Sequence, residues 1–157
     1  MTQIMKTVVQ YFNDYNWPVS KREEETALQT AFQGKNGEWT CYVFTSEEQQ
    51  YLAFYSICPE GVVEDRRMAV AEFITRINYG LVIGNFELDF KDGEVRFKTS
   101  IDVEGDRLSK ALVGQVVLPN VVMMDKCLPS IMKVISGDTS PAQAAADIED
   151  VNKNQSI

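Results

Sequence analysis

The sequence contains no histidine among its 157 residues. Histidine is the commonest general base near neutral pH, a frequent zinc ligand and the usual partner of a catalytic serine or cysteine. Its absence removes the most familiar metal sites and nucleophile–base pairs. We therefore predict that the protein is not an enzyme, and we assign no catalytic, metal-binding or cofactor-binding residues and no cofactor.

Cysteine is also scarce. The three thiols, Cys41, Cys58 and Cys127, are widely spaced, form no Cys-X-X-Cys pair and lie in apolar surroundings. This pattern is typical of reduced thiols in the core of a cytoplasmic protein. Cys58 precedes Pro59 and a predicted helix, where a thiolate could be stabilised, but no base accompanies it. We interpret Cys58 as a small residue that ends a strand.

Runs of positive charge are missing as well. The net charge is −8 and the sequence pI is about 4.6, with basic residues single or in pairs among acidic ones. Such a field repels phosphate backbones and anionic lipid. The longest apolar stretch, 112–124, is interrupted by Gly114 and Pro119 and is too short to span a bilayer. The N-terminus lacks a signal-peptide pattern. We expect a cytoplasmic protein that binds neither nucleic acid nor membrane.

What the sequence does contain is the composition of one globular domain. Hydrophobic residues make up 45% and charged residues 24%, which is close to the average for folded proteins. A chain of this length can bury a sizeable core without disulfide bonds or metal. No linker or internal repeat divides it, so we predict a single domain over residues 1–157.

Apolar periodicity and turn residues predict alternating groups of helices and strands. Helices are expected over 3–15, 63–79 and 109–136, with a short acidic helix from Ser140 to 151 and a frayed tail over 152–157. Strands are expected over 25–33, 38–44, 50–58, 85–91 and 94–104. Pro119 predicts a break in the third helix and Pro129 a kink, because each removes a backbone donor. Contiguous strands indicate an antiparallel sheet of the α+β class.

The strands over 85–91 and 94–104 give the clearest local signal. They alternate strictly between apolar and polar residues, and Asp92-Gly93 between them is typical of a two-residue hairpin turn. That turn predicts a register in which Phe90 lies opposite Val95, with Leu88 opposite Phe97 and Phe86 opposite Thr99. On the polar side Asp89 would face Arg96 and Glu87 would face Lys98, so opposite charges would meet.

The strands over 38–44 and 50–58 differ from this hairpin because both of their faces are apolar. Trp39, Cys41 and Val43 share one face, whereas Tyr42 and Phe44 share the other. A sheet that is apolar on both sides must be covered twice. Either the chain's own helices cover both faces, or a second copy or a client protein covers one. The residues proposed for such an interface are Trp39, Tyr42, Phe44, Tyr51 and Tyr55.

Several segments in the middle of the chain resemble the YbjN-like family of bacterial sensory transduction regulators. They are Asn78-Tyr79-Gly80-Leu81, residues 83–89, residues 93–98 and residues 100–104, with a weaker similarity at Met124-Asp125 and Leu128-Pro129. The resemblance implies the type III secretion chaperone-like fold. In that fold the element order is α-β-β-β-α-β-β-α, and a five-stranded antiparallel sheet of order 1-2-3-5-4 packs against helices, usually in a homodimer. The resemblance implies no catalytic residues for this sequence.

Three functions are compatible with these features. The first is a non-enzymatic protein-binding module, chaperone-like or regulatory in signal transduction, which binds an unidentified protein and forms a homodimer. The second is a small-ligand sensor with a pocket between the long last helix and the sheet, lined by Met123 and Met124. The third is an enzyme that uses carboxylates alone, which we disfavour because nearly all acidic residues fall on predicted solvent-facing positions.

Overall fold

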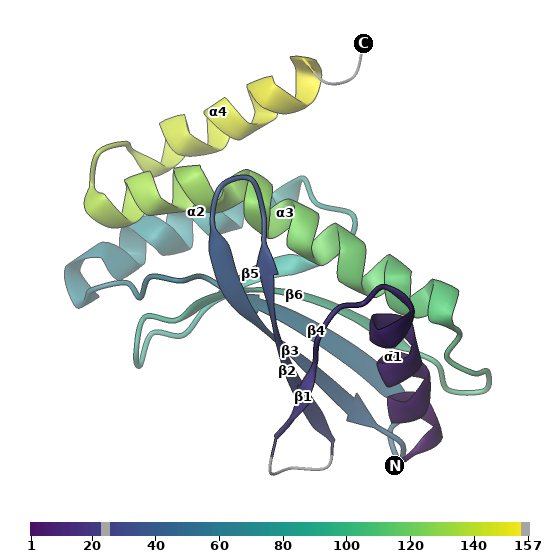
Figure 1. Cartoon of the computed structure of the whole chain (residues 1–157). Coiled ribbons are helices and arrows are strands. Elements are labelled where there is room, and N and C mark those ends of the chain that lie inside the picture. Colours follow the sequence, from purple (N-terminus) through teal and green to yellow (C-terminus); the bar gives the residue numbers. More distant parts are fainter. Residues whose placement is uncertain (23–25, 155–157) are drawn as a thin grey trace.

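The computed structural model of the chain describes residues 1–22 and 26–154, with 150–154 described by their backbone alone (Figure 1). The helices are α1 (Gln3–Asp14), α2 (Arg67–Tyr79), α3 (Lys110–Ser136) and α4 (Pro141–Asn154), with a 3₁₀ turn, η1 (Glu64–Arg66), before α2. The strands are β1 (Ser20–Lys21), β2 (Ala27–Gln33), β3 (Glu38–Ser46), β4 (Tyr51–Ile57), β5 (Asn85–Leu88) and β6 (Val95–Asp102). The predicted elements are therefore all present. Of the predicted tail, 152–154 are helical, and 155–157 lie outside the described residues.

The strands form one antiparallel sheet in the order β1-β2-β3-β4-β6-β5. This confirms the α+β class and the predicted order of the five longer strands. The sheet has six strands and not five, because Ser20 and Lys21 pair with Gln29 and Leu28 at the outer edge of β2. Two residues are too few to give a recognisable alternation, so β1 was not predictable from pattern.

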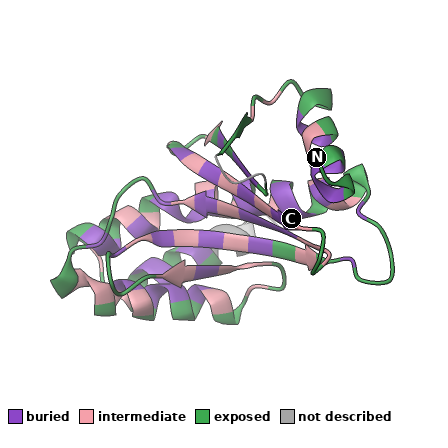
Figure 2. Cartoon of the chain, turned by 90° about the horizontal axis from the view of Figure 1, so that it is seen from below, coloured by how far each residue is buried: buried purple, intermediate pink, exposed green. Residues whose placement is uncertain are grey.

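One face of the sheet carries the whole hydrophobic core. Along β3 and β6 buried residues alternate with intermediate ones, as Figure 2 shows. The buried side chains, such as Val43, Phe54 and Phe97, belong to a single cluster with residues of α1, α2, α3 and α4. α1 packs on β3, α2 on β5 and α3 on β4 and β6, whereas α4 packs on α2 and α3. Every described helix thus lies on the same side of the sheet.

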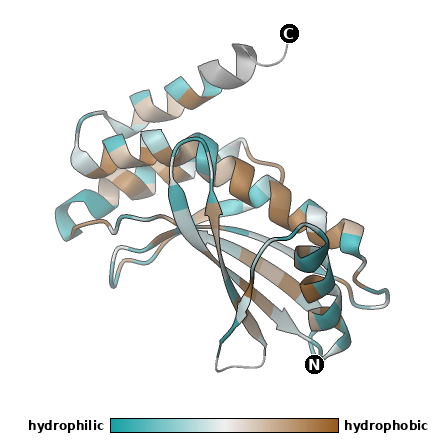
Figure 3. Cartoon of the chain, viewed as in Figure 1, coloured by the Kyte–Doolittle hydropathy of each residue, from teal (hydrophilic) through white to brown (hydrophobic). Residues whose placement is uncertain are grey.

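α3 is the central helix of this layer. It is 27 residues long and begins at Ser109, whose side chain accepts a hydrogen bond from the Leu112 N–H. Gly137 caps its C-terminus in the left-handed conformation. Hydrophobic residues occur along most of its length (Figure 3). By length and composition alone it could cross a membrane, but half of its most apolar window is buried within the fold, as in the core helix of a globular domain.

The predicted break at Pro119 is wrong, because α3 runs through both prolines without interruption. The kink at Pro129 stays a prediction. Pro129 has no N–H for the Asp125 carbonyl, and the Asn36 side-chain amide donates to that carbonyl instead at 3.0 Å. The carbonyl freed by Pro119 belongs to Gln115, an exposed residue whose backbone water can solvate. A long-range contact therefore replaces the helical bond that is missing at Pro129.

Asp125 also fixes the turn between β2 and β3. Its carboxylate accepts hydrogen bonds from the backbone N–H groups of Lys35 and Asn36, at 3.1 and 2.8 Å. Gly34 is needed there, because a Cβ atom at that position would lie 2.2 Å from the nearer Asp125 oxygen. The turn is thus attached to the middle of α3.

Asn120 attaches α3 to the centre of the sheet. Its side chain is fully buried, and its amide nitrogen lies 3.0 Å from the backbone oxygens of Phe54 and Phe97 and from the Thr99 hydroxyl. The Thr99 hydroxyl in turn donates to the Val116 carbonyl at 2.7 Å. Buried hydrogen bonds are costly to lose, because the groups left behind are buried without a partner.

We predict that Asn120→Ala lowers the free energy of unfolding by about 2–3 kcal/mol, because buried hydrogen bonds are lost and a cavity remains. Urea denaturation followed by circular dichroism measures this change. Gln115→Ala is the control, since Gln115 is exposed on the same helix and should change stability by about 0.5 kcal/mol or less. Equal stabilities for the two variants would contradict the role assigned to Asn120.

The register predicted for the hairpin is wrong by two residues. Phe86 pairs with Phe97, Glu87 with Arg96 and Leu88 with Val95, and β5 ends at Leu88. Phe90 is 55% exposed instead of facing Val95. The predicted two-residue turn is a wider loop over 89–94, in which the Asp89 N–H donates to the Glu94 carbonyl and the Gly93 N–H to the Asp89 carbonyl.

A contact from outside the hairpin sets this loop. The Val62 N–H donates to the Gly93 carbonyl at 2.9 Å, and a Cβ atom on Gly93 would lie 2.0 Å from the Val62 carbonyl oxygen. Gly93 has φ +80°, as a left-handed turn residue should. The hairpin signal therefore identified the strands and the glycine correctly, whereas the packing of 59–63 against the loop decided the register.

Candidate interaction surface

The face of the sheet opposite the helices is open in the described part of the chain. Four of the five residues proposed for an interface lie on it, namely Tyr42, Phe44, Tyr51 and Tyr55, and all four are partly exposed. Trp39 does not join them. It is 3% exposed in the core on the helix side, where its indole N–H donates to the Ser56 hydroxyl. The prediction that two adjacent strands are apolar on both faces is confirmed, and the chain's described helices cover only one face.

The aromatic residues on this open face form a connected cluster. Tyr42 on β3 pairs directly with Tyr55 on β4, and the Phe44 ring lies edge-on to Tyr55 at 5.7 Å between centroids. Two arginines flank the pair, with Arg22 4.9 Å from the Tyr42 ring centre and Arg96 4.4 Å from the Tyr55 ring centre. Rings stacked against cations are held in place at low entropic cost, so the face presents a preformed aromatic surface.

Arg96 is held over Tyr55 by an ion pair with Glu87 on β5. Glu87 is also paired with Lys98, which lies diagonally across the two strands, and both pairs measure 2.5 Å. Partial burial alone would raise the pKa of Glu87, but hydrogen bonds from Lys98 and Arg96 outweigh it and lower that pKa. Glu87 therefore remains ionised at neutral pH and directs both cations toward the β5 side of the face.

Part of each edge of the sheet is occupied by the chain's own residues. At β5, the Asn78 side chain accepts a hydrogen bond from the Phe86 N–H at 2.8 Å and donates one to the Phe86 carbonyl at 3.0 Å. At β2, residues 17–22 occupy the edge. β1 pairs with β2, the Trp17 indole N–H donates to the Ala31 carbonyl, and the Arg22 N–H donates to the Ala27 carbonyl. Edge groups that are occupied in this way cannot pair with strands of other chains.

A shallow hollow of about 460 Å³ indents the open face beside Tyr42. Its lining includes Ile57, Pro59 and Thr40, and two carboxylates, Glu38 and Glu94, stand at its sides. The hollow opens widely to solvent, which suits the insertion of a partner's side chain more than the enclosure of a small molecule.

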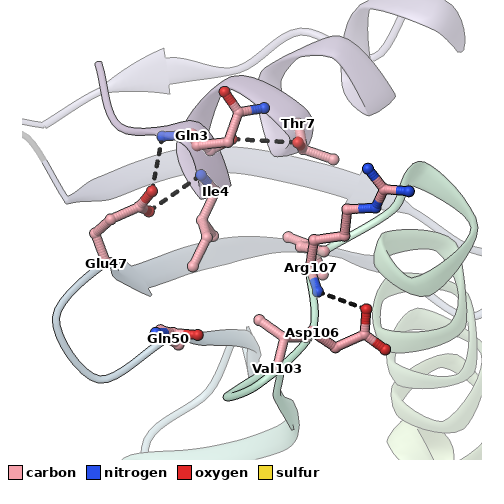
Figure 4. Close-up of a pocket in the computed structure, with 9 residues that line it drawn as sticks. Gln3, Ile4, Thr7, Glu47, Gln50, Val103, Asp106 and Arg107 are labelled. Carbon is pink, nitrogen blue, oxygen red and sulfur yellow. Dashed lines mark hydrogen bonds between the residues drawn. The ribbon is translucent and has the colours of Figure 1, made fainter.

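A smaller hollow of about 250 Å³ lies between α1, the β3–β4 turn and the loop that precedes α3 (Figure 4). Glu47 in its wall accepts hydrogen bonds from the backbone N–H groups of Gln3 and Ile4, at 3.0 and 3.1 Å, and so caps α1. The volume is below the range of about 300–1,000 Å³ typical of ligand sites.

A hollow of about 670 Å³ lies between α3 and the β2–β3 turn, lined by Val121, Val122, Asp125 and Lys126 of α3 and by residues 32–36, and it opens widely to solvent. The methionines predicted to line a sensor pocket are not part of it. Met124 is fully buried and Met123 packs against the same core. In the described residues no group of three or more cysteines and carboxylates is placed to hold a metal ion. The open face is therefore the feature with the clearest capacity to bind a partner.

The three thiols are all buried and free of disulfide bonds. Burial raises the pKa of Cys41 and of Cys127 to about 12 and the pKa of Cys58 to about 11. For Cys58 a backbone hydrogen bond from Glu60 only partly offsets the burial. Since the thiolate is the reactive form, none of the three is activated as a nucleophile.

We predict that the folded protein reacts slowly with a thiol reagent such as dithionitrobenzoate at pH 7.5, because too little thiolate is present and access is blocked. In the protein unfolded in guanidinium chloride, all three thiols should react with the reagent. Absorbance at the two conditions measures the difference, with a small free thiol as the rate control. Rapid labelling of Cys58 in the folded state would show that it is a reactive cysteine.

Together, the fold and this face define a one-sided α+β domain that offers a surface and not an identified catalytic centre. The family model for YbjN, described as "Putative bacterial sensory transduction regulator", matches residues 6–117. Because the match covers more than half of the chain, this protein belongs to the YbjN family. No curated protein matches the sequence.

A solved structure shares the fold. It is the crystal structure of YbjN from E. coli, described as "a putative transcription regulator", with a TM-score of 0.61. The match covers 85% of this chain and 90% of that one, and the sequences are 13% identical. At that identity the likeness shows the fold alone, and the resemblance inferred from the central segments is confirmed.

The structure also reveals contributors to the face that the sequence did not suggest. Arg22, which follows β1, reaches the Tyr42 ring across β2, and Arg96 reaches the Tyr55 ring because β6 pairs with β4. The alternation of β6 does place Arg96 and Lys98 on one face, but without the strand order the neighbours of that face are unknown. Asn78, within the segment that carries the resemblance, acts structurally by occupying part of the β5 edge.

Proposed function

We propose that this protein is a non-enzymatic regulatory module that acts by binding another protein through the open face of its sheet. One observation carries the proposal: Tyr42, Phe44, Tyr51 and Tyr55 lie together, partly exposed, on a sheet face that no described helix covers. Tyrosine supplies a large contact area with few rotatable bonds and is enriched at binding hot spots.

The occupied edges support the face, and not a sheet edge, as the binding site. Asn78 occupies the backbone groups of Phe86, and residues 17–22 occupy the edge of β2. A partner that added a strand to the sheet would have to displace one of these segments. A partner that lies across the face displaces nothing but water.

Membership of the YbjN family supports a regulatory role in signal transduction, since that is how the family is described. A chaperone-like action on a client protein is the finer form of the same proposal. We place the protein in the cytoplasm because its three thiols are free and buried. The expected homodimer remains a prediction.

The test is affinity capture of the tagged full chain from its native cells, followed by identification of the bound protein and measurement with purified components. Tyr42→Ser/Tyr55→Ser removes two rings from the face and should reduce binding at least about ten-fold, because aromatic hot spots each contribute on the order of 2 kcal/mol. Thermal unfolding checks that the variant is folded.

Tyr79→Ser is the matched control. Tyr79 is 96% exposed at the end of α2, away from the open face, so its removal should leave binding unchanged. Capture of the bait alone, or full binding of the partner by the face variant, would refute the proposal.

A further inference from the structure

We infer that the partner of the open face is a basic, extended segment of another protein, with an arginine or lysine side chain seated in the hollow between Glu38 and Glu94. This inference rests on the proposed function and adds the chemistry of the partner. It follows from how charge is distributed over the face, from the shape of the hollow and from the net charge of the chain.

The acidic residues of the face gather at one end. Glu38 begins β3, and Glu94 immediately precedes β6; both contribute to the hollow. Asp89 belongs to the loop beside Glu94 and shares a neighbouring depression with it. None of these three carboxylates forms an ion pair with another described residue. Arg96 lines the same depression as Asp89 and Glu94 but is paired with Glu87, so this end of the face carries a net negative charge.

The basic residues of the face do not neutralise that end. Arg96 and Lys98 are both paired with Glu87 on the β5 side, and Arg96 also lies over Tyr55. Arg22 lies over Tyr42, at the opposite corner of the sheet from Glu94. The cations are thus held by rings and by Glu87, which leaves Glu38 and Glu94 available to a cation from outside.

The shape of the hollow fits a long basic side chain. Glu38 and Glu94 flank the end of β4, so two strand spacings, about 10 Å, separate their backbones. The floor between them includes Ile57 and Tyr42, which can cover the aliphatic stem of an arginine or lysine. A guanidinium at the tip would then lie between two carboxylates, in the charge-assisted geometry that such groups favour.

A second copy of this chain fits the same face poorly. Each copy carries a net charge of −8, so two copies repel at long range. A face-to-face pair would set the acidic end either against itself or against the end that carries Asp102 and Arg22, and Arg22 is already held over the Tyr42 ring. The C-terminal helix does not supply an occupant either, since α4 packs on α2 and α3 and lies beyond the helix layer (Figure 1).

The test uses three short synthetic peptides and the isotope-labelled full chain, with binding followed by NMR chemical shifts. The first peptide alternates arginine with leucine and phenylalanine, the second replaces every arginine by glutamate, and the third replaces the apolar residues by serine. We expect the first to shift the amide signals of Tyr42, Ile57 and Glu94, more weakly as salt is added. The other two should bind at least about ten-fold more weakly.

The double substitution Glu38→Gln/Glu94→Gln should weaken the binding of the arginine peptide by about ten-fold, because two charge contacts are lost. Glu48→Gln/Glu104→Gln removes the same charge from two exposed turns and is the matched control, with unchanged binding expected. The inference would be overturned if the glutamate peptide bound as tightly as the arginine peptide, or if both double variants lost the same amount of binding. In that case the proposed function would still stand if Tyr42→Ser/Tyr55→Ser abolished capture of the cellular partner, and it would fall if that variant captured the partner normally.

Discussion

The attachment of α3 to one side of the sheet determines the rest of this structure. Asn120 contributes the polar part of that attachment, by donating from a fully buried position toward the backbone oxygens of Phe54 and Phe97. Such a contact has no substitute in an apolar layer, so it specifies where the helix lies as well as how strongly it binds. With α1, α2 and α4 packed around α3 on the same side, the described chain has no helix left for the opposite face.

Because all the described helices lie on one side of the sheet, the opposite face of the sheet is left open as a surface. The thiols lie in the core with raised pKa values. Among the described carboxylates, Glu47 caps α1, Asp125 binds the β2–β3 turn and Glu87 pairs with cations. The face left open is nevertheless not an ordinary polar one. It combines an aromatic cluster, cations held over the rings and an acidic hollow, whereas the edges beside it are partly occupied by Asn78 and by residues 17–22. A partner therefore meets a rigid face with a charged end.

The sequence predicted those parts of the fold that depend on local pattern. Periodicity located the helices and the longer strands. It also placed Tyr42 and Phe44 on one face of their strand and Cys41 and Val43 on the other. It failed where a distant residue decides the outcome. Pro129 is accommodated because Asn36 donates to the Asp125 carbonyl, and the hairpin register depends on Val62 against Gly93. Trp39 is predicted as an interface residue, although alternation along the strand places it on the same face as Cys41 and Val43, which is the core face. The hollow between Glu38 and Glu94 required the strand order.

The most direct measurement of the central claim compares the solvent exposure of single tyrosines in the purified protein and in extract of its native cells. Hydroxyl-radical footprinting with mass spectrometry reports the oxidation of each residue. Binding across the open face predicts that Tyr42, Tyr51 and Tyr55 are oxidised less in the extract, whereas Tyr79, which is 96% exposed at the end of α2, is oxidised equally in both. Unchanged oxidation of the three face tyrosines, or protection of Tyr79 alone, would contradict the account.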